Sequence, residues 1–262
     1  MPLSPETRAK LRGVSTATLA TALFKRGLHR QMIQDVLPLS APKQTMVGEA
    51  VTLRYMPARE DLNRIDVFTN PAHPQRHAIE NCPAGAVFVI DSRKDARAAS
   101  AGGILVTRLM ARGAEGVVTD GGFRDSAEIA GLGFPAYHHR PSAPTNLTLH
   151  HAIEANVPIG CGDAPVFPGD VMVGDADGVI VLPAHLADEL AAEAVEMTAY
   201  EDFATEKVRA GASITGLYPA TDPANLTAFA AWRRRNGRQE GPTWHGARDR
   251  PAPAPQGLAG TG

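Results

Sequence analysis

The fold is decided by residues 86–125, which read AVFVIDSRKDARAASAGGILVTRLMARGAEGVVTDGGFRD. Two short apolar runs, Ala86–Asp91 and Gly116–Asp120, have the continuous hydrophobicity of strands that are buried on both faces. Between them, Gly102–Arg112 carries apolar residues at helical spacing and ends at Gly113. This alternation of strand, helix and strand predicts a parallel βαβ unit at the centre of an α/β protein.

Further elements extend this unit in both directions. Helical spacing from Ser4-Pro5 to Gly27, with a break near Gly13, predicts two N-terminal helices. The other expected elements are a strand at 47–55, a loop with short helical turns at 57–81, a short helix at 125–130, a strand at 134–138, a hairpin turning at 175–178, and helices at 184–210 and 222–235. We expect residues 1–235 to form one domain, and the Gly- and Pro-rich residues 236–262 to form a disordered tail.

Composition excludes several classes of protein. The chain has 262 residues and a net charge of −2, which argues against a protein that coats nucleic acid or an anionic membrane. Cys82 and Cys161 form neither a disulfide framework nor a CxxC pair. No apolar run approaches the ~20 residues that span a bilayer, and the N-terminus lacks a hydrophobic signal core. We therefore expect a cytoplasmic protein with no nucleic-acid or membrane partner.

The run Asp120-Gly121-Gly122-Phe123-Arg124-Asp125 is the strongest candidate for chemistry, because it follows a buried strand and opens a helix. Its two glycines allow a tight turn and close approach to a ligand. Arg124 can bind a carboxylate with its planar fork, and Asp125 can ligate a hard divalent cation such as Mg²⁺. The structural alternative is a glycine-rich turn, with Asp125 as helix N-cap and Arg124 in a salt bridge.

The run Ser100-Ala101-Gly102-Gly103-Ile104-Leu105 begins the preceding helix. A helix that starts on glycines exposes its first backbone amides and the positive end of its dipole, which suits an anion. A simple helix start is the common alternative. Because both runs follow consecutive parallel strands, we expect their tips to lie side by side and to form one site for an anion and a metal.

The run Gly102–Asp125 resembles the signature of the proteins similar to regulator of ribonuclease activity A. That family includes divalent-metal-dependent 4-hydroxy-4-methyl-2-oxoglutarate aldolases, which are also oxaloacetate decarboxylases. The resemblance extends from STATLATAL at residues 15–23 through PGDVMVGDADGVIVLP at 168–183 to the helix at 184–210. It implies an α/β fold: a compact, swivelling-domain-like β/β/α sandwich with a parallel βαβ core, N-terminal helices and a C-terminal helical extension.

The resemblance also implies a site. Backbone amides of Gly102, Gly103, Ile104 and Leu105, together with Arg124, would hold pyruvate, and Asp125 would bind Mg²⁺ or Mn²⁺. The assembly would be a homotrimer or hexamer with sites between subunits. A carboxylate from the C-terminal helix of a neighbouring subunit would support the metal-bound water, and its candidates are Glu201, Asp202 and Glu206.

The sequence departs from the family pattern at two positions. Gly103 stands where the aldolases commonly have an acidic residue that holds a metal-linked water, and Ala22 stands where many members have aspartate in the first helix. The first departure puts aldolase turnover or its substrate in question. It leaves the metal ligand and the pyruvyl pocket in place.

Three functions are compatible with these residues. The leading hypothesis is a metal-dependent lyase, with Arg124 and Asp125 as its catalytic residues. It would cleave 4-hydroxy-2-oxo acids to pyruvate or decarboxylate oxaloacetate, since both reactions pass through the pyruvate enolate. The alternative is a non-catalytic regulator that binds ribonuclease E or another RNA-processing partner. A third is a lyase or hydratase that acts on sugar-derived 2-oxo acids.

Weaker signals point elsewhere. Lys94 could form a Schiff base in a metal-free aldolase, although its charged neighbours indicate a solvated turn. His73, His77 and Glu80 would share one face of a helix, a spacing that can ligate a metal but that often arises by chance. The adjacent histidines at 138–139 and 150–151 should point in different directions.

Overall fold

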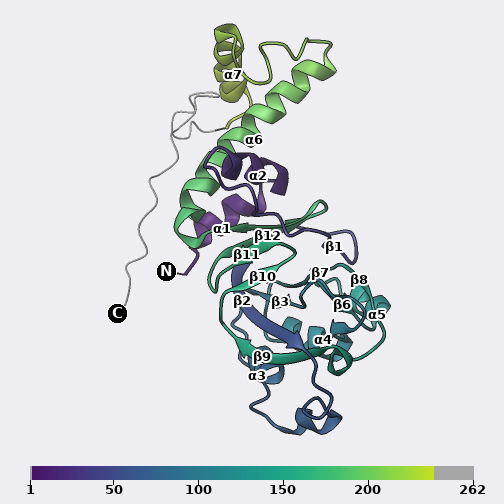
Figure 1. The fold of residues 1–262 in the computed structure, drawn as a ribbon. Coiled ribbons are helices and arrows are strands. Elements are labelled where there is room, and N and C mark those ends of the chain that lie inside the picture. The colour runs from purple at the N-terminus through teal and green to yellow at the C-terminus, as the bar shows by residue number, and fades with distance from the viewer. Residues whose placement is uncertain (1, 239–262) are drawn as a thin grey trace.

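The computed structural model describes residues 2–238, in which a strongly curved sheet carries two groups of helices (Figure 1). The α-helices are α1 (Pro5–Arg12), α2 (Thr16–Phe24), α3 (Pro74–Glu80), α4 (Gly103–Ala111), α5 (Ser126–Gly131), α6 (Ala187–Arg209) and α7 (Pro223–Arg235). Short 3-10 helices cover Ile65–Thr69, Asn146–Thr148 and Ala184–Leu186. The predicted tail lies outside the described residues from position 239 onward.

The main sheet contains eight strands. They are β1 (Leu37–Pro38), β2 (Met46–Pro57), β3 (Ala86–Asp91), β5 (Gly116–Thr119), β7 (Ala136–His138), β9 (His150–Ala155), β12 (Val171–Asp175) and β13 (Gly178–Leu182). Their order is β1-β7-β5-β3-β2-β12-β13, and β9 pairs with β2. Strands β2, β3, β5 and β7 run parallel, which confirms the predicted parallel core. The β12–β13 hairpin turns at Asp175–Gly178, as expected.

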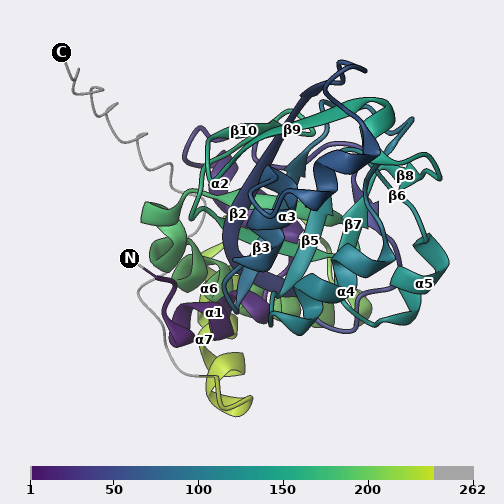
Figure 2. The same cartoon turned by 90° about the horizontal axis from the view of Figure 1, so that it is seen from below.

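Side chains alternate between the two faces of this sheet. On β3, Phe88 and Ile90 pack toward α3, α4 and α5, whereas Val87 and Val89 point into the concave side. The concave side is closed by the small hairpin of β10 (Ile159–Cys161) and β11 (Ala164–Val166). Burial on both faces explains why the strand sequences are continuously apolar. Figure 2 shows α3 and α4 lying across the central parallel strands.

The second group of helices packs on the hairpin end of the sheet. Helices α1 and α2 are capped by Ser4 and Ser15, whose hydroxyls accept hydrogen bonds from backbone amides in the first turn. Both helices contact α6, and their apolar residues share one cluster with β12 and β13. Ala22 is fully buried in that cluster, so a carboxylate at this position would lie in the apolar core rather than at a ligand.

The far half of α6 extends beyond the sheet and carries α7 (Figure 1). There, Tyr200, Phe203, Phe229 and Trp232 form a separate aromatic cluster. The buried guanidinium of Arg233 lies 2.5 and 3.0 Å from the two carboxylate oxygens of Glu196, joining α7 to α6 by a bidentate ion pair.

A small parallel sheet beside α4 was not predicted. It consists of β4 (Ala99–Ala101), β6 (Gly122–Phe123) and β8 (Arg140–Pro141), in the order β4-β6-β8. The helix start at Gly102 therefore follows β4 and not the long strand β3, from which it is separated by the loop at 92–98. The expectation that both candidate runs directly follow consecutive strands of the main sheet was wrong in this respect.

Within residues 2–238, no helix is long and apolar enough to cross a membrane.

Buried histidines should make the fold acid-sensitive. His138 stacks on Phe123 with ring centroids 5.5 Å apart, and burial lowers its pKa to about 4. The folded state requires neutral His138, whereas the unfolded chain takes up a proton near pH 6.5. Stability from this residue is therefore complete above pH 6.5 and is lost as pH falls toward 4.

We expect His138→Phe to reduce the loss of unfolding free energy between pH 7 and pH 5 by on the order of 1 kcal/mol, measured by urea denaturation. His139→Gln is the matched control, because His139 is exposed on the adjacent position. An unchanged pH dependence in His138→Phe would contradict this assignment.

Candidate active site

The small sheet brings the two candidate runs together. Ala101 of β4 pairs with Phe123 of β6, and the Arg124 amide donates to the Ala101 carbonyl over 3.1 Å. Gly102, the residue after Ala101, is the N-cap of α4, and Asp125, the residue after Arg124, is the N-cap of α5. The predicted meeting of the two loop tips is therefore present, and it depends on the pairing of two strands that end two and three residues before their helices begin.

Asp125 faces the start of α4. Its backbone is left-handed, with φ 58° and ψ 36°, and its Oδ2 accepts a hydrogen bond from the Gly103 amide over 3.1 Å. Arg124 Nε lies 3.5 Å from the same oxygen, and the two side chains are 48% and 40% exposed. An exposed pair at this distance is weak, so neither group is confined to an internal salt bridge.

Gly102 has no room for a side chain. A β-carbon on Gly102 would lie 2.8 Å from Cγ of Arg124 and 2.9 Å from Oδ2 of Asp125. A β-carbon on Gly103 would lie 2.9 Å from Oε2 of Glu128. Because Gly102 and Gly103 have no β-carbon, the side chains of Arg124, Asp125 and Glu128 can approach the backbone at the start of α4.

The amides of the α4 start have different roles. The Leu105 amide donates to the Gly102 carbonyl over 3.0 Å and belongs to the helix, whereas the Gly103 amide binds Asp125. Among the described residues, the Ile104 amide has no hydrogen-bond partner. The Ile104 side chain is 82% exposed beside it. The positive end of the α4 dipole thus remains available to an anion at Ile104.

A buried polar network supports the site from below. The Asp120 carboxylate accepts backbone hydrogen bonds from Ser92 at 2.6 Å, Lys94 at 3.0 Å and Gly162 at 3.2 Å. Burial raises the Asp120 pKa, and these amides oppose that effect. Sequence reasoning placed Asp120 in the motif without assigning it this role. The signal that could have found it is a carboxylate at the end of an apolar strand.

Hydroxyl groups extend this network. Ser100 Oγ lies 2.7 Å from Ser92 Oγ and 2.6 Å from Thr119 Oγ1, and Thr119 Oγ1 also accepts a hydrogen bond from the Gly121 amide. All three hydroxyl residues are fully buried. They connect the ends of β3, β4 and β5, so the strands that carry the site are held in register.

The three C-terminal carboxylates lie on α6, away from α5 (Figure 1). Glu201 accepts hydrogen bonds from Thr18 at 2.9 Å and Tyr218 at 3.2 Å. Asp202 pairs with Arg238, and Glu206 accepts from the Trp232 indole at 2.7 Å. Each carboxylate therefore has a partner in its own chain.

The weaker candidates have structural explanations. Lys94 is half exposed and pairs with Asp163, as a solvated turn requires. Glu80 pairs with Arg108 at 2.7 Å, and His73 is a buried N-cap of α3. The side chains of His150 and His151 diverge: His150 stacks on Tyr55, whereas His151 Nδ1 contacts Asn63 Oδ1.

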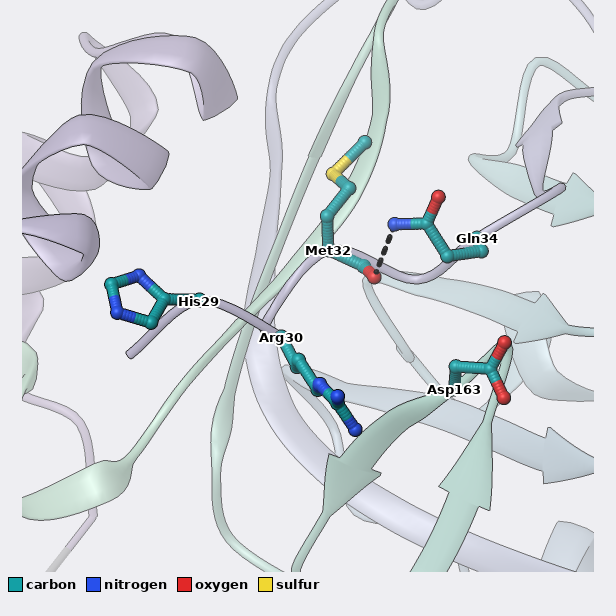
Figure 3. A pocket seen from close by; sticks show the side chains of 5 residues that line it. All are labelled: His29, Arg30, Met32, Gln34 and Asp163. Atoms are coloured by element: carbon teal, nitrogen blue, oxygen red, sulfur yellow. Dashed lines mark hydrogen bonds between the residues drawn. The ribbon is translucent and has the colours of Figure 1, made fainter. Parts of the chain in front are cut away.

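Two further features bear on binding. A hollow of about 330 Å³ is lined by His29, Arg30, Met32, Gln34 and Asp163, and contains none of the predicted site residues (Figure 3). Within residues 2–238, no group of three or more His, Cys, Asp or Glu could hold a metal. A cation at Asp125 would therefore keep several waters or take ligands from another chain.

Comparison with known proteins identifies the family. The RraA-like family, described as Aldolase/RraA, matches residues 16–181, which is more than half of the chain. The chain belongs to this family, and the match includes β1 to β12, most of β13 and both halves of the candidate site.

Individual relatives agree with this assignment. A protein of Halalkalibacterium halodurans, provisionally named 4-hydroxy-4-methyl-2-oxoglutarate aldolase, is 37% identical over 106 residues, which are 40% of this chain and 50% of that protein. A Thermus thermophilus protein with the same provisional name is 32% identical over 110 residues, 41% and 65% of the two chains. The alignment with the first of these relatives thus spans about half of that relative's length.

Solved structures have the same fold. Streptomyces coelicolor RraAS2, described as an unusual member of the RNase ES inhibitor RraA protein family, has a TM-score of 0.69 and 26% identity, covering 78% of this chain and 98% of that chain. An uncharacterized protein from Pseudomonas syringae has a TM-score of 0.70 and 23% identity, covering 83% and 99%. The α/β fold expected from the sequence is confirmed.

Removal of the Asp120 carboxylate should destabilise the protein. Asp120→Ala would leave three backbone amides without their acceptor, and each unsatisfied buried donor costs about 1–3 kcal/mol. We expect a loss of at least about 2 kcal/mol in the free energy of unfolding, measured by urea denaturation. Asp163→Asn, at an exposed carboxylate nearby, should cost less than about 1 kcal/mol, because asparagine also tolerates the left-handed backbone at this position (φ 65°). Equal losses in the two variants would show that Asp120 does not organise these loops.

Proposed function

We propose that this protein is a divalent-metal-dependent lyase that cleaves 4-hydroxy-2-oxo acids to pyruvate, decarboxylates oxaloacetate, or does both. The observation that carries the proposal is the position of Arg124 and Asp125 at the glycine start of α4. Asp125 Oδ2 lies 3.5 Å from Arg124 Nε and accepts a hydrogen bond from the Gly103 amide, and the next amide, that of Ile104, has no partner among the described residues. Family membership and the names of the relatives support the lyase class.

The residues present fit Mg²⁺ or Mn²⁺. Asp125 offers a partly exposed carboxylate, and the absence of a β-carbon on Gly102 allows its Oδ2 to lie against the start of α4. Carboxylate oxygen is the ligand that these hard cations prefer, and Mg²⁺ commonly binds through one or two carboxylates while keeping its other waters. When bound, the cation would supply Lewis-acid polarisation of the 2-oxo group.

The chain's own residues would bind and orient the substrate. The Arg124 guanidinium would donate two parallel hydrogen bonds to the carboxylate of a 2-oxo acid. The Ile104 amide and the α4 dipole would face the oxygen that gains negative charge when the carbon–carbon bond breaks. In decarboxylation, the electron pair of the broken bond enters the pyruvate enolate and CO₂ leaves. Both reactions produce the same enolate, so one site could serve both.

We further propose that the active assembly is a homotrimer or hexamer. Asp125 is partly exposed. The described part of its own chain contains no group of three or more His, Cys, Asp or Glu residues that could hold a metal ion. A carboxylate from a neighbouring α6, of which Glu201, Asp202 and Glu206 remain the candidates, could complete the site. The exposed Ile104 side chain is an apolar surface that a substrate or a neighbouring subunit could cover.

Arg124 substitutions test the substrate-binding role. We expect Arg124→Ala to lower kcat/KM for oxaloacetate by about 100-fold or more, because the removed group holds both the substrate carboxylate and developing charge. Arg124→Lys should recover only part of this loss, since a lysine cannot make the bidentate contact. Arg140→Ala is the control at an exposed arginine of the adjacent strand β8. Near-wild-type turnover in Arg124→Ala would contradict the proposal.

Metal removal tests the cofactor. Oxaloacetate decarboxylation should stop in EDTA and return when Mg²⁺ or Mn²⁺ is added in excess, measured against the protein-free rate at the same metal concentration. Asp125→Asn should require much more metal for half-maximal activity, because an amide carries no negative charge. Activity that persists in EDTA would exclude the metal-dependent mechanism.

A regulatory role is the second candidate, since one structural relative is described as a member of an RNase inhibitor family. Inhibition of purified ribonuclease E by this chain, together with absent lyase activity, would favour that role. Turnover that depends on Arg124 and metal, without inhibition, would favour the enzyme.

A further inference from the structure

Arg76, on α3, is a half-buried arginine without an acidic partner. Its Nε atom is buried and makes no hydrogen bond, and within residues 2–238 its guanidinium forms no ion pair. The guanidinium stacks over the ring of Phe68, with its central carbon 4.4 Å from the ring centroid. A positive charge that is partly removed from water and lacks a carboxylate is unfavourable by itself, and a bound anion would relieve this cost.

The packing of α3 on α4 places Arg76 beside the start of α4. The two helices contact each other on one face of the main sheet (Figure 2), and both connect parallel strands, so they run in the same direction. Glu80 of α3 pairs with Arg108 of α4 at 2.7 Å. Arg76 and Ile104 come one helical turn before these two residues, so this register places Arg76 next to Ile104.

Buried hydrogen bonds fix this position relative to the candidate active site. Gln75 Nε2 donates to the Tyr55 hydroxyl over 2.7 Å and to the Ser100 carbonyl over 2.9 Å. The Tyr55 hydroxyl donates to the same carbonyl over 2.8 Å. Ser100 lies two residues before Gly102, the N-cap of α4. The first turn of α3, which carries Arg76, is therefore attached to the strand that positions the start of α4.

Other buried polar atoms around Arg76 also lack partners. Oε1 of fully buried Gln75 and Nδ1 of buried His73 make no hydrogen bond. Burial, followed by the positive charges of Arg76 and His151, lowers the pKa of His73, so His73 is neutral near pH 7. Arg76 thus contributes one positive charge beside a neutral imidazole. One positive charge matches a carboxylate better than a phosphate, which carries nearly two negative charges.

We propose that Arg76 is a specificity-determining residue that binds a second carboxylate at the far end of the substrate. This inference rests on the proposed function and names its substrate class, which is 2-oxo acids with a carboxylate at both ends. Helix α4 lies between α3 and α5 (Figure 2). The head of the substrate would bind at Arg124, before α5, and its tail would extend past Ile104 to Arg76. Because packed helices lie about 8–10 Å apart, this arrangement favours acids longer than oxaloacetate.

Binding of 2-oxo acids that the enzyme does not cleave tests this role. 2-Oxoadipate and 2-oxohexanoate have carbon chains of the same length, but only 2-oxoadipate has a carboxylate at its far end. We expect the wild-type chain in excess Mg²⁺ to bind 2-oxoadipate about tenfold more tightly or better, measured by isothermal titration calorimetry at pH 7. Arg76→Gln should remove most of this preference, and Arg76→Lys should retain part of it, because lysine keeps the charge but loses the planar fork.

Arg108→Gln is the matched control. It removes the same charge from the same pair of helices, but Arg108 lies one turn farther from the start of α4 and already pairs with Glu80. We expect Arg108→Gln to keep the wild-type preference for 2-oxoadipate. Loss of the preference in both variants would overturn the inference, because a general change in charge would then explain it.

The remaining outcomes separate the inference from the proposed function. Equal weakening of both ligands in Arg76→Gln would overturn the inference, since Arg76 would then only support the fold. A preference that persists in Arg76→Gln, or a wild type that shows none, would overturn it too. These results leave the lyase proposal standing if the wild type decarboxylates oxaloacetate and Arg124→Ala does not. A wild type without decarboxylase activity that still prefers 2-oxoadipate through Arg76 would overturn the lyase proposal and support the carboxylate site.

Discussion

Three chain segments meet on the carboxylate of Asp120, and the candidate site depends on that convergence. The amides of Ser92 and Lys94 come from the loop after β3, and the Gly162 amide comes from the β10–β11 turn. Loss of these donors would leave a buried carboxylate without hydrogen bonds, which costs a large free energy. The loop after β3 and the β10–β11 turn are therefore held to the end of β5. The loop after β3 leads directly into β4, and β4 positions the start of α4.

Glycines allow the side chains of the candidate site to approach the start of α4. Strand pairing between β4 and β6 brings the N-termini of α4 and α5 together, but a side chain at residue 102 or 103 would separate them. With glycine at both positions, Arg124, Asp125 and Glu128 approach the backbone of α4. A helix N-terminus favours nearby carboxylates, which agrees with the positions of Asp125 and Glu128 at the start of α4.

Much of this arrangement was predictable. The apolar runs of β3 and β5, the helix between them and the β12–β13 hairpin follow from periodicity and turn residues. Strands β4, β6 and β8 did not follow, because pieces of two or three residues contain no measurable period. The run from Asp120 to Asp125 was recognised as a motif, whereas Glu128 was missed because nothing in its local sequence indicates which neighbour it faces.

The sequence by itself determined the α/β class, the family signature and the identity of the chemical groups, since these depend on local hydrophobic pattern and residue type. Only the tertiary structure decided that the Asp125 carboxylate accepts a hydrogen bond from the Gly103 amide and that the Glu128 carboxylate lies beside α4. It also decided that the Leu105 amide is unavailable to a ligand, because that amide donates to the Gly102 carbonyl. These contacts join residues from different helices and strands. Their geometry depends on strand register and helix approach, which a single sequence does not encode in any one segment.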